Sequence, residues 1–354
     1  MWEVFSKIAY FSNILAQLKV KGHLLVQYRR IVDTLGISYS IMLRIGKLLV
    51  FEEEEIMKLL TFYDGNETKL GVKMEEGVVD LTAALTVEPE TAIPTDIMAL
   101  IRGGNEAVNL VEQYVDKLKP TGSESYVREE SSLTFAPAVT QPSKIICVGL
   151  NYKKHADETG LAYPEYPVLF NKFSNALAGH NEAVAVPRTT ERLDYEVELG
   201  IVIGKEAKYV SEEAALDYVF GYCTTNDLSA RDLQKRASQW LTGKSNDGFA
   251  PVGPYVVTKD EIEDPNRLRL TTTVNGEMRQ DSNTADMIYS VEELVSYISQ
   301  YMTLEPGDLI LTGTPEGVII GQPIAERVYL KAGDEVTVEV EQLGALTTKF
   351  IADK

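Results

Sequence analysis

Residues 194–204 read DYEVELGIVIG, and this stretch decides what fold to expect. Side chains of a strand alternate between its two faces, so Glu196 and Glu198 should share one face while Tyr195, Val197 and Leu199 share the other. Beyond that point the stretch is continuously apolar, as in a strand buried on both faces. The pattern predicts a central, buried strand that carries two acidic side chains near its beginning.

Outward from this segment, most of the chain shows short apolar runs bounded by turn residues, which is typical of strands. No regular alternation of strands and helices occurs, and no glycine-rich loop follows a strand, so a dinucleotide-binding domain is not expected. The sequence therefore predicts an α+β, β-rich fold. Strands are expected at 58–63, 71–74, 78–81, 144–150, 167–171, 195–204, 219–226, 253–258, 269–275, 309–312, 335–341 and 346–351, and helices at 95–118, 211–217, 231–238 and 290–301.

A linker rich in Pro and Ser at residues 119–142 divides the pattern. We therefore expect a small N-terminal α+β domain with its linker at 57–140 and a catalytic domain at 141–354. Residues 1–56 differ in composition, with seven Lys/Arg and six Asp/Glu against 27 and 47 in the remainder. Glutamate codons consist of purines, so the four consecutive glutamates at 52–55 imply a run of purines in the gene shortly before the codon of Met57. Such a run resembles a ribosome-binding site. A translation start assigned too early is thus the favoured interpretation, and a genuine helical extension is the alternative.

The net charge of −19 argues against nucleic-acid and membrane partners, because both need basic patches. Apolar stretches near the N-terminus are interrupted well short of the ~20 residues of a membrane span. Two cysteines in apolar runs, Cys147 and Cys223, suit a reducing cytoplasm. In so acidic a chain, an anionic substrate would need a metal ion or a few well-placed cations.

The glutamate pair suggests chemistry if a third carboxylate joins it. Glu196 and Glu198 repel each other unless a positive charge lies between them, and Mg²⁺ or Mn²⁺ prefers carboxylate oxygens. Asp227 ends an apolar strand and either caps the following helix or points at the same place as the pair. Alternatively, the glutamates belong to a solvated strand face.

Other candidate residues follow strand ends or lie in turns. Glu158 lies three residues after His155, where it can orient the imidazole of a general base, although such pairs are common on surfaces. Arg231 and Gln234 share a helix face or face solvent in a turn. Lys244 and Thr314 are two further candidates, and both lie among small residues. Small residues allow a ligand to approach the backbone closely, but they also occur in loops and turns without a function.

Taken together, these segments resemble the fumarylacetoacetate hydrolase family, in particular its bacterial acylpyruvase-like and 2-hydroxyhepta-2,4-diene-1,7-dioate isomerase-like members. The resemblance rests on five motifs in the family's order between about residues 144 and 350, each weak alone and specific in combination. They are VGLNYKKH at 148–155, DYEVEL at 194–199, NDLSARDLQ at 226–234, GKS at 243–245 and TGTPEGV at 312–318.

The resemblance implies the family's mixed β-sandwich roll, a homodimer, and one Mg²⁺ or Mn²⁺ ion per subunit. By the matching positions, the metal ligands would be Glu196, Glu198 and Asp227. The dyad that activates water would be His155 and Glu158. Lys244 would stabilise an enolate or oxyanion, and the substrate contacts would come from Arg231, Gln234 and Thr314.

The activity so implied is the hydrolysis of a C–C bond in a small, acylpyruvate-type 2-oxo acid through a metal-bound enolate. An isomerase of hydroxymuconate-type diacids and an oxaloacetate decarboxylase are alternatives on the same scaffold. A ligand-binding protein without activity is a third, and the His155–Glu158 pair argues against it because binding alone needs no base.

Overall fold

The computed structural model describes residues 56–353, and residues 56–354 form one compact unit. The expectation of an early translation start concerns residues outside the described part of the chain. Strands dominate this unit, as the sequence predicts. Among the described residues, no helix combines the length and apolar character needed to cross a membrane.

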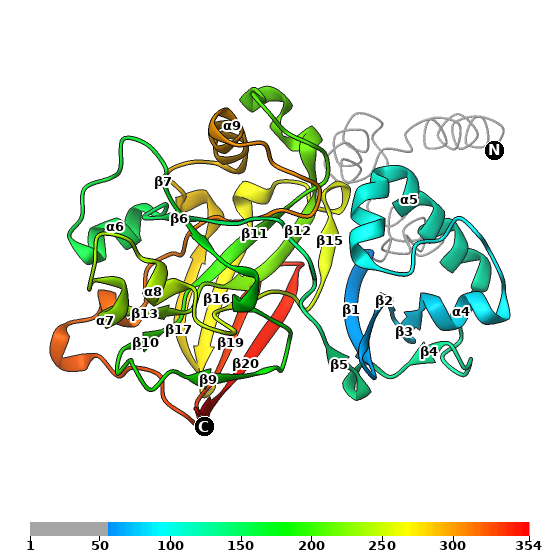
Figure 1. Cartoon of the computed structure of the whole chain (residues 1–354), viewed down its shortest axis with the longest axis horizontal. Coiled ribbons are helices and arrows are strands. Elements are labelled where there is room, and N and C mark those ends of the chain that lie inside the picture. The colour runs from blue at the N-terminus through cyan, green and yellow to red at the C-terminus, as the bar shows by residue number, and fades with distance from the viewer. Residues whose placement is uncertain (1–55, 354) are drawn as a thin grey trace, which may run out of the picture. The chain divides into compact units, whose positions relative to one another are not determined.

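The larger sheet runs in the order β4-β3-β2-β1-β15-β12-β11-β18-β6-β7, and β5 pairs with β1 outside this path (Figure 1). Its central strand, β11, is buried along its whole length and pairs antiparallel with both β12 and β18, which confirms the buried strand predicted at 195–204. The strands are β1 (Lys58–Asp64), β2 (Glu67–Met74), β3 (Gly77–Asp80), β4 (Val127–Arg128), β5 (Thr134–Phe135), β6 (Ile145–Gly149), β7 (Val168–Lys172), β11 (Val197–Ile203), β12 (Val219–Asn226), β15 (Val256–Thr258) and β18 (Leu309–Leu311).

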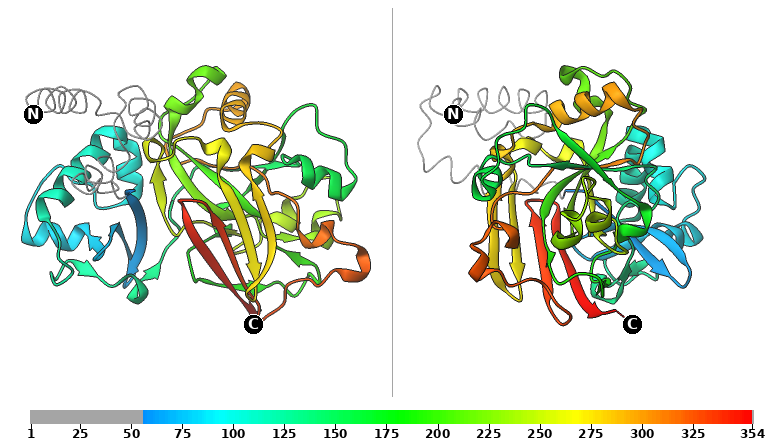
Figure 2. Two further views of the ribbon diagram at one scale, coloured as in Figure 1. Left: turned by 180° about the vertical axis from the view of Figure 1, so that it is seen from behind. Right: turned by 60° about the vertical axis from the view of Figure 1, so that its left-hand side comes forward.

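A second, five-stranded sheet runs in the order β17-β16-β19-β20-β9. In its middle strand, Val336, Val338 and Val340 are fully buried and alternate with more exposed residues, so one face turns to the core. This face packs on β11 and β12, and Figure 2 shows the two layers from two further sides. The fold is thus the mixed β-sandwich that was expected. The strands are β9 (Ala183–Val186), β16 (Arg269–Val274), β17 (Glu277–Asn283), β19 (Glu335–Val340) and β20 (Gly344–Ala352).

Short elements connect the sheets. Two small sheets pair β10 (Leu193–Asp194) with β13 (Ser229–Ala230) and β8 (Leu177–Ala178) with β14 (Ala250–Pro251). The α-helices are α4 (Leu81–Val87), α5 (Ile97–Leu118), α6 (Lys153–Thr159), α7 (Arg231–Gln234), α8 (Leu241–Lys244) and α9 (Val291–Tyr301). The 3₁₀ turns are η1 (Glu130–Ser132), η2 (Ser174–Ala176), η3 (Glu212–Tyr218), η4 (Lys259–Glu261), η5 (Pro265–Arg267), η6 (Thr284–Asp286), η7 (Ile319–Gly321) and η8 (Ile324–Glu326).

Several element boundaries differ from the expectations for physical reasons. The chain turns helical at Leu81 rather than continuing a strand, because the Asp80 side chain accepts from the Ala83 N–H and caps α4. Helix α5 is interrupted at Gly104, whose φ is 57°. The helix expected at 231–238 ends at Gln234. Strand β1 pairs with β15, so the N-terminal strands continue the larger sheet, and the domain boundary near residue 140 stays a prediction.

Candidate metal centre and active site

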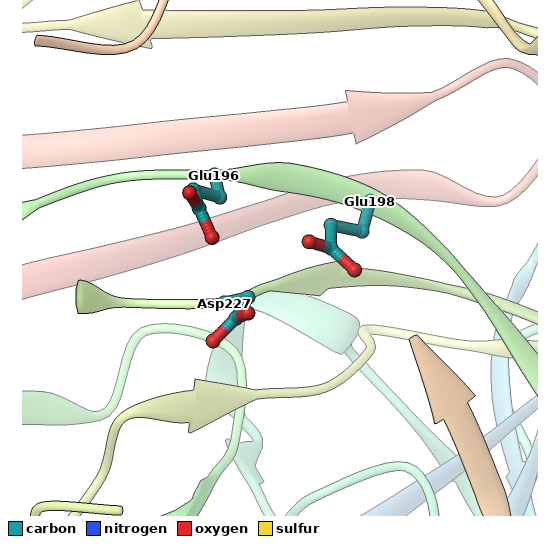
Figure 3. A group of neighbouring side chains, drawn as sticks. All are labelled: Glu196, Glu198 and Asp227. Carbon is teal, nitrogen blue, oxygen red and sulfur yellow. The ribbon is translucent and has the colours of Figure 1, made fainter. Parts of the chain in front are cut away.

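Three carboxylates meet where β11 begins and β12 ends. Glu198 lies in β11, Glu196 immediately precedes this strand, and Asp227 immediately follows β12. The antiparallel register pairs Glu198 with Thr225, which brings the start of one strand beside the end of the other. One oxygen from each carboxylate lies within 4.8 Å of the other two, and Figure 3 shows the three side chains converging. The interpretation of Asp227 as a helix cap is wrong, because α7 begins at Arg231, its N-cap residue is Ala230, and no side chain caps it.

Two of the three carboxylates are paired with buried cations. Glu196 accepts from Arg231 Nη2 and Lys244 Nζ, each at 2.6 Å, and Asp227 accepts from Lys244 Nζ at 2.6 Å. Lys172 Nζ contacts the other oxygen of Asp227 at 2.6 Å. Burial alone would raise the pKa of Glu196, but the charges of Arg231 and Lys244 outweigh it and hold this pKa below its ordinary value.

Glu198 differs from its two neighbours. Among residues 56–353 no cation pairs with its carboxylate, which accepts only from the Gly313 N–H, at 2.8 Å. Burial, followed by the negative charges of Asp227 and Glu196, raises its pKa well above the ordinary value. A buried, all-oxygen donor set with one carboxylate lacking a counter-charge fits a hard divalent cation. The residues that would hold it are Glu196, Glu198 and Asp227.

The predicted His155–Glu158 pair forms within α6. His155 Nδ1 lies 2.7 Å from Glu158 Oε1, and the second oxygen of Glu158 accepts from the Gly317 N–H at 3.0 Å. A carboxylate on Nδ1 favours the tautomer with its proton there, which leaves Nε2 as the proton acceptor. His155 is 7% exposed, so the pair is not a solvated surface pair.

Arg231 and Gln234 are buried on one face of α7, and the alternative of a solvent-facing turn is wrong for them. Arg231 donates through Nε to Asp194 at 2.8 Å, through Nη2 to Glu196, and through Nη1 to Gln234 Oε1 at 3.1 Å. The Thr314 hydroxyl accepts from Gln280 Nε2 at 3.0 Å. Arg231 therefore fixes Glu196 in place, and it also lines the cavity.

One cavity of about 290 Å³ collects all nine predicted site residues. The triad, the His155–Glu158 pair, Lys244, Arg231, Gln234 and Thr314 all line it. Apolar side chains complete the wall: Val148, Leu150, Leu161, Phe170, Trp240 and Ile320. Five motifs that are far apart in sequence thus form a single site, although their individual roles stay predictions.

Sequence reasoning missed two supporting residues. Lys172, at the end of β7, donates to the carbonyls of Leu228, Lys244 and Phe249 at 2.6–2.9 Å and contacts Asp227. A lysine at the end of an apolar strand was the available signal. Asp194 accepts from Arg231 and from the N–H groups of residues 319 and 320. Its place in the DYEVEL motif marked it, but no partner was visible in the sequence.

Comparison with known proteins shows the family of the chain. Residues 144–351 match the fumarylacetoacetate hydrolase C-terminal family. The chain belongs to the fumarylacetoacetate hydrolase family. Members of this family are enzymes that act on oxo acids, and this chain is an enzyme of the same kind.

Family members of known name or structure cover most of the chain. The fumarylacetoacetate hydrolase domain-containing protein 2 homolog of Dictyostelium discoideum is 40% identical over 82% of this chain and 96% of its own. A mitochondrial oxaloacetate tautomerase of Bos taurus is 40% identical over 78% of this chain and 84% of its own. Two solved structures each match 84% of this chain and the whole or nearly the whole of their own. They are the fumarylacetoacetate hydrolase of Exiguobacterium antarcticum (34% identity, TM-score 0.70, 100% of its chain) and the 2-hydroxyhepta-2,4-diene-1,7-dioate isomerase of Mycobacterium marinum (30%, 0.63, 99%).

Proposed function

We propose that this chain catalyses keto–enol tautomerisation of a small 2-oxo acid, with His155 as the base. The observation that carries the proposal is the shared cavity: the His155–Glu158 pair and the carboxylate triad open into the same space. A base alone suits many reactions. A base beside a donor set for a hard cation suits removal of a proton next to a carbonyl group, since the cation stabilises the charge that develops on oxygen.

The chain's own residues account for the proton movements. Glu158 holds the imidazole so that Nε2 of His155 takes a proton from C3 of the substrate. The imidazolium then returns this proton to the 2-oxygen, which completes tautomerisation without net change in protons. A divalent cation bound by the triad would supply Lewis-acid polarisation of the 2-oxo group. The Lys244 ammonium, fixed by Glu196 and Asp227, places a further positive charge in this region.

Similarity supports this choice over the other activities that the scaffold allows. The relative from Bos taurus, named an oxaloacetate tautomerase, aligns with 84% of its length. Hydrolysis of a C–C bond is the second candidate, because the same base can instead activate water and the cavity has room for it at about 30 Å³ per molecule. The solved structure from Exiguobacterium antarcticum carries a hydrolase name.

A substrate panel tests the proposal. Oxaloacetate tautomerisation, followed by the ultraviolet absorbance of the enol, should be accelerated by the protein with Mg²⁺ or Mn²⁺ and not with EDTA. Acylpyruvate cleavage, assayed in parallel, should be slower. Faster cleavage than tautomerisation would favour the second candidate. Equal tautomerisation by wild type and Glu198→Gln, in the presence of metal, would overturn the proposal.

A further inference from the structure

The cavity contains more cationic side chains than its carboxylates engage. Four line it: Arg231, Lys235, Lys244 and Arg327. Arg231 is committed to Asp194 and Glu196, and Lys244 to Glu196 and Asp227. The charges of Arg231 and Lys244 are therefore already paired with carboxylates of the triad and with Asp194. The other two belong to different segments, Lys235 directly after α7 and Arg327 directly after η8.

Lys235 and Arg327 have no carboxylate partner within residues 56–353. Within the described part of the chain, the Arg327 side chain makes one hydrogen bond, from Nε to the Gln322 carbonyl at 2.8 Å. It fixes the guanidinium and leaves both terminal nitrogens for a ligand. The pKa of Lys235 is lowered by partial burial and then by the charges of Arg231, Arg327 and Arg192. The charges of described residues that shift this pKa are all positive. In a chain of net charge −19, two cationic side chains that line a cavity without a carboxylate of the described residues in contact need an explanation.

The location of the pair separates it from the triad. Lys235 is exposed and Arg327 half-buried, whereas the three carboxylates are buried, so the pair lies toward the solvent side of the cavity. Lys235 follows Arg231 by one helical turn, about 5.4 Å along the axis, and its N–H bonds to the Arg231 carbonyl. Lys235 is thus one turn further along the chain than the arginine that binds Glu196, and both members of the pair line the same cavity as the triad.

The charges of the lining residues give the class of ligand. The four cations face four carboxylates, those of Glu158, Glu196, Glu198 and Asp227. A divalent cation on the triad would leave two positive charges in excess, which a dianion neutralises. We propose that Lys235 and Arg327 form a second anion site that receives the distal carboxylate of a dicarboxylic 2-oxo acid. This inference rests on the proposed function for the other end of the substrate, the 2-oxo acid group.

Matched substrates test the site. Oxaloacetate and its 4-methyl ester share the 2-oxo acid group and differ in the distal charge. Lys235→Gln and Arg327→Gln should each raise KM for oxaloacetate about 10-fold or more, as expected for loss of a charge-assisted hydrogen bond, with little change in kcat. Neither should change KM for the monoester more than about twofold. Arg236→Gln is the control, because this neighbour of Lys235 does not line the cavity.

Binding separates this inference from the proposed function. Calorimetry of the Mg²⁺-containing protein with 3,3-difluorooxaloacetate, which has no C3 proton to lose, and with its 4-methyl ester needs no turnover. Wild type should bind the diacid at least 10-fold more tightly, and the Lys235→Gln, Arg327→Gln double variant should bind both alike. A protein that shows this preference without tautomerase activity would refute the function and keep the site. Equal binding of diacid and monoester by wild type, or equal effects of the substitutions on both, would overturn the site.

Discussion

Glu196 and Glu198 lie two residues apart, yet their surroundings are opposite. Glu196 is bound by the guanidinium of Arg231 and the ammonium of Lys244, whereas Glu198 accepts from one backbone N–H. Removing one partner of a buried ion pair leaves an uncompensated charge, while removing a buried charge that has no partner relieves the fold. Substitutions at these two positions should therefore have opposite effects on stability and the same effect on metal binding.

We expect Glu198→Gln to be at least as stable as wild type without metal, and Glu196→Gln to lose about 3–5 kcal/mol of unfolding free energy. Thermal unfolding with and without Mn²⁺ measures both properties. Wild type should gain about 2.7 kcal/mol at a Mn²⁺ concentration 100 times Kd, and both variants should lose this gain. Stabilisation of Glu198→Gln by Mn²⁺ to the same extent as wild type would contradict the metal site.

His155 is expected to transfer protons without contributing to metal binding. His155→Ala should leave the Mn²⁺-induced thermal shift in place, because the three carboxylates already provide an oxygen donor set. Turnover should fall about 10²–10⁴-fold, the usual contribution of a general base. If decarboxylation is the main activity, the loss should be smaller, since that C–C bond breaks without removal of a C3 proton and without an attacking water. Wild-type turnover in His155→Ala would remove this residue from the mechanism.

The residues with chemical side chains were largely predictable, and their partners were not. Strand alternation put Glu196 and Glu198 on one face, whereas the resemblance to the family, not spacing, assigned Asp227 to the same site. Lys172 and Asp194 escaped prediction, because their roles depend on carbonyls and N–H groups that only the folded chain brings near. Motif patterns mark the reacting groups better than the groups that hold them.

At the level of elements, the turn after β18 fixes one side of the metal site. Gly313 has a φ of 97°, and its N–H donates to Glu198. A Cβ atom here would lie 2.9 Å from both the Val148 carbonyl oxygen and the Asn151 Cβ. Gly333 has a similar φ, 94°, but open space around it. Substituting each glycine by alanine therefore distinguishes two contributions to stability: backbone strain, which both positions share, and steric crowding, which only Gly313 has.

Gly333→Ala should cost about 1–2 kcal/mol of stability, from the left-handed backbone alone. Gly313→Ala should cost this and about 1–3 kcal/mol more from overpacking, and it should weaken Mn²⁺ binding because the turn must shift away from Glu198. Chemical denaturation and calorimetric titration with Mn²⁺ compare the pair. Equal stability and equal Mn²⁺ affinity in the two variants would show that the turn does not position Glu198.

Helices and strands were predicted correctly where one pattern of apolar residues extended over the whole element. The prediction failed where a capping side chain, or a position at the edge of a sheet, determined the structure. Strands β11 and β12 are continuously buried, and their sequence patterns showed it. Strand β17 has the mostly polar sequence EMRQDSN and lies at the edge of its sheet, so its hydrophobic pattern is weak. Helix α4 depends on the capping carboxylate of Asp80, which a pattern of apolar residues does not detect.

At the scale of the whole molecule, the described unit contains every residue of the proposed site. The sheet order connects β1 through β15, β12 and β11 to β18, so the strands nearest Met57 belong to the same sheet as the metal site. Met57 is 8% exposed, and Leu59 and Leu60 are fully buried. Loss of residues from β1 onward would therefore disturb the sheet that holds the triad. The homodimer implied by the resemblance stays a prediction, to be tested by light scattering.

A chain that starts at Met57 should fold and retain activity. The physical reason is that residues 56–354 form one compact unit, with its hydrophobic core and all nine predicted site residues inside it. We expect the shortened chain to keep the wild-type unfolding temperature within about 2 °C, roughly the shift that a change of 1 kcal/mol produces in a unit of this size. Its Mn²⁺ affinity and turnover should equal those of the full chain. A chain starting at Leu60 is the control, because it lacks Lys58 and Leu59, the residues of β1 that pair with β15, and it should be clearly less stable. A large loss of stability or activity on starting at Met57 would show that the first 56 residues are a structural part of the enzyme, and the inference of an early translation start would be wrong.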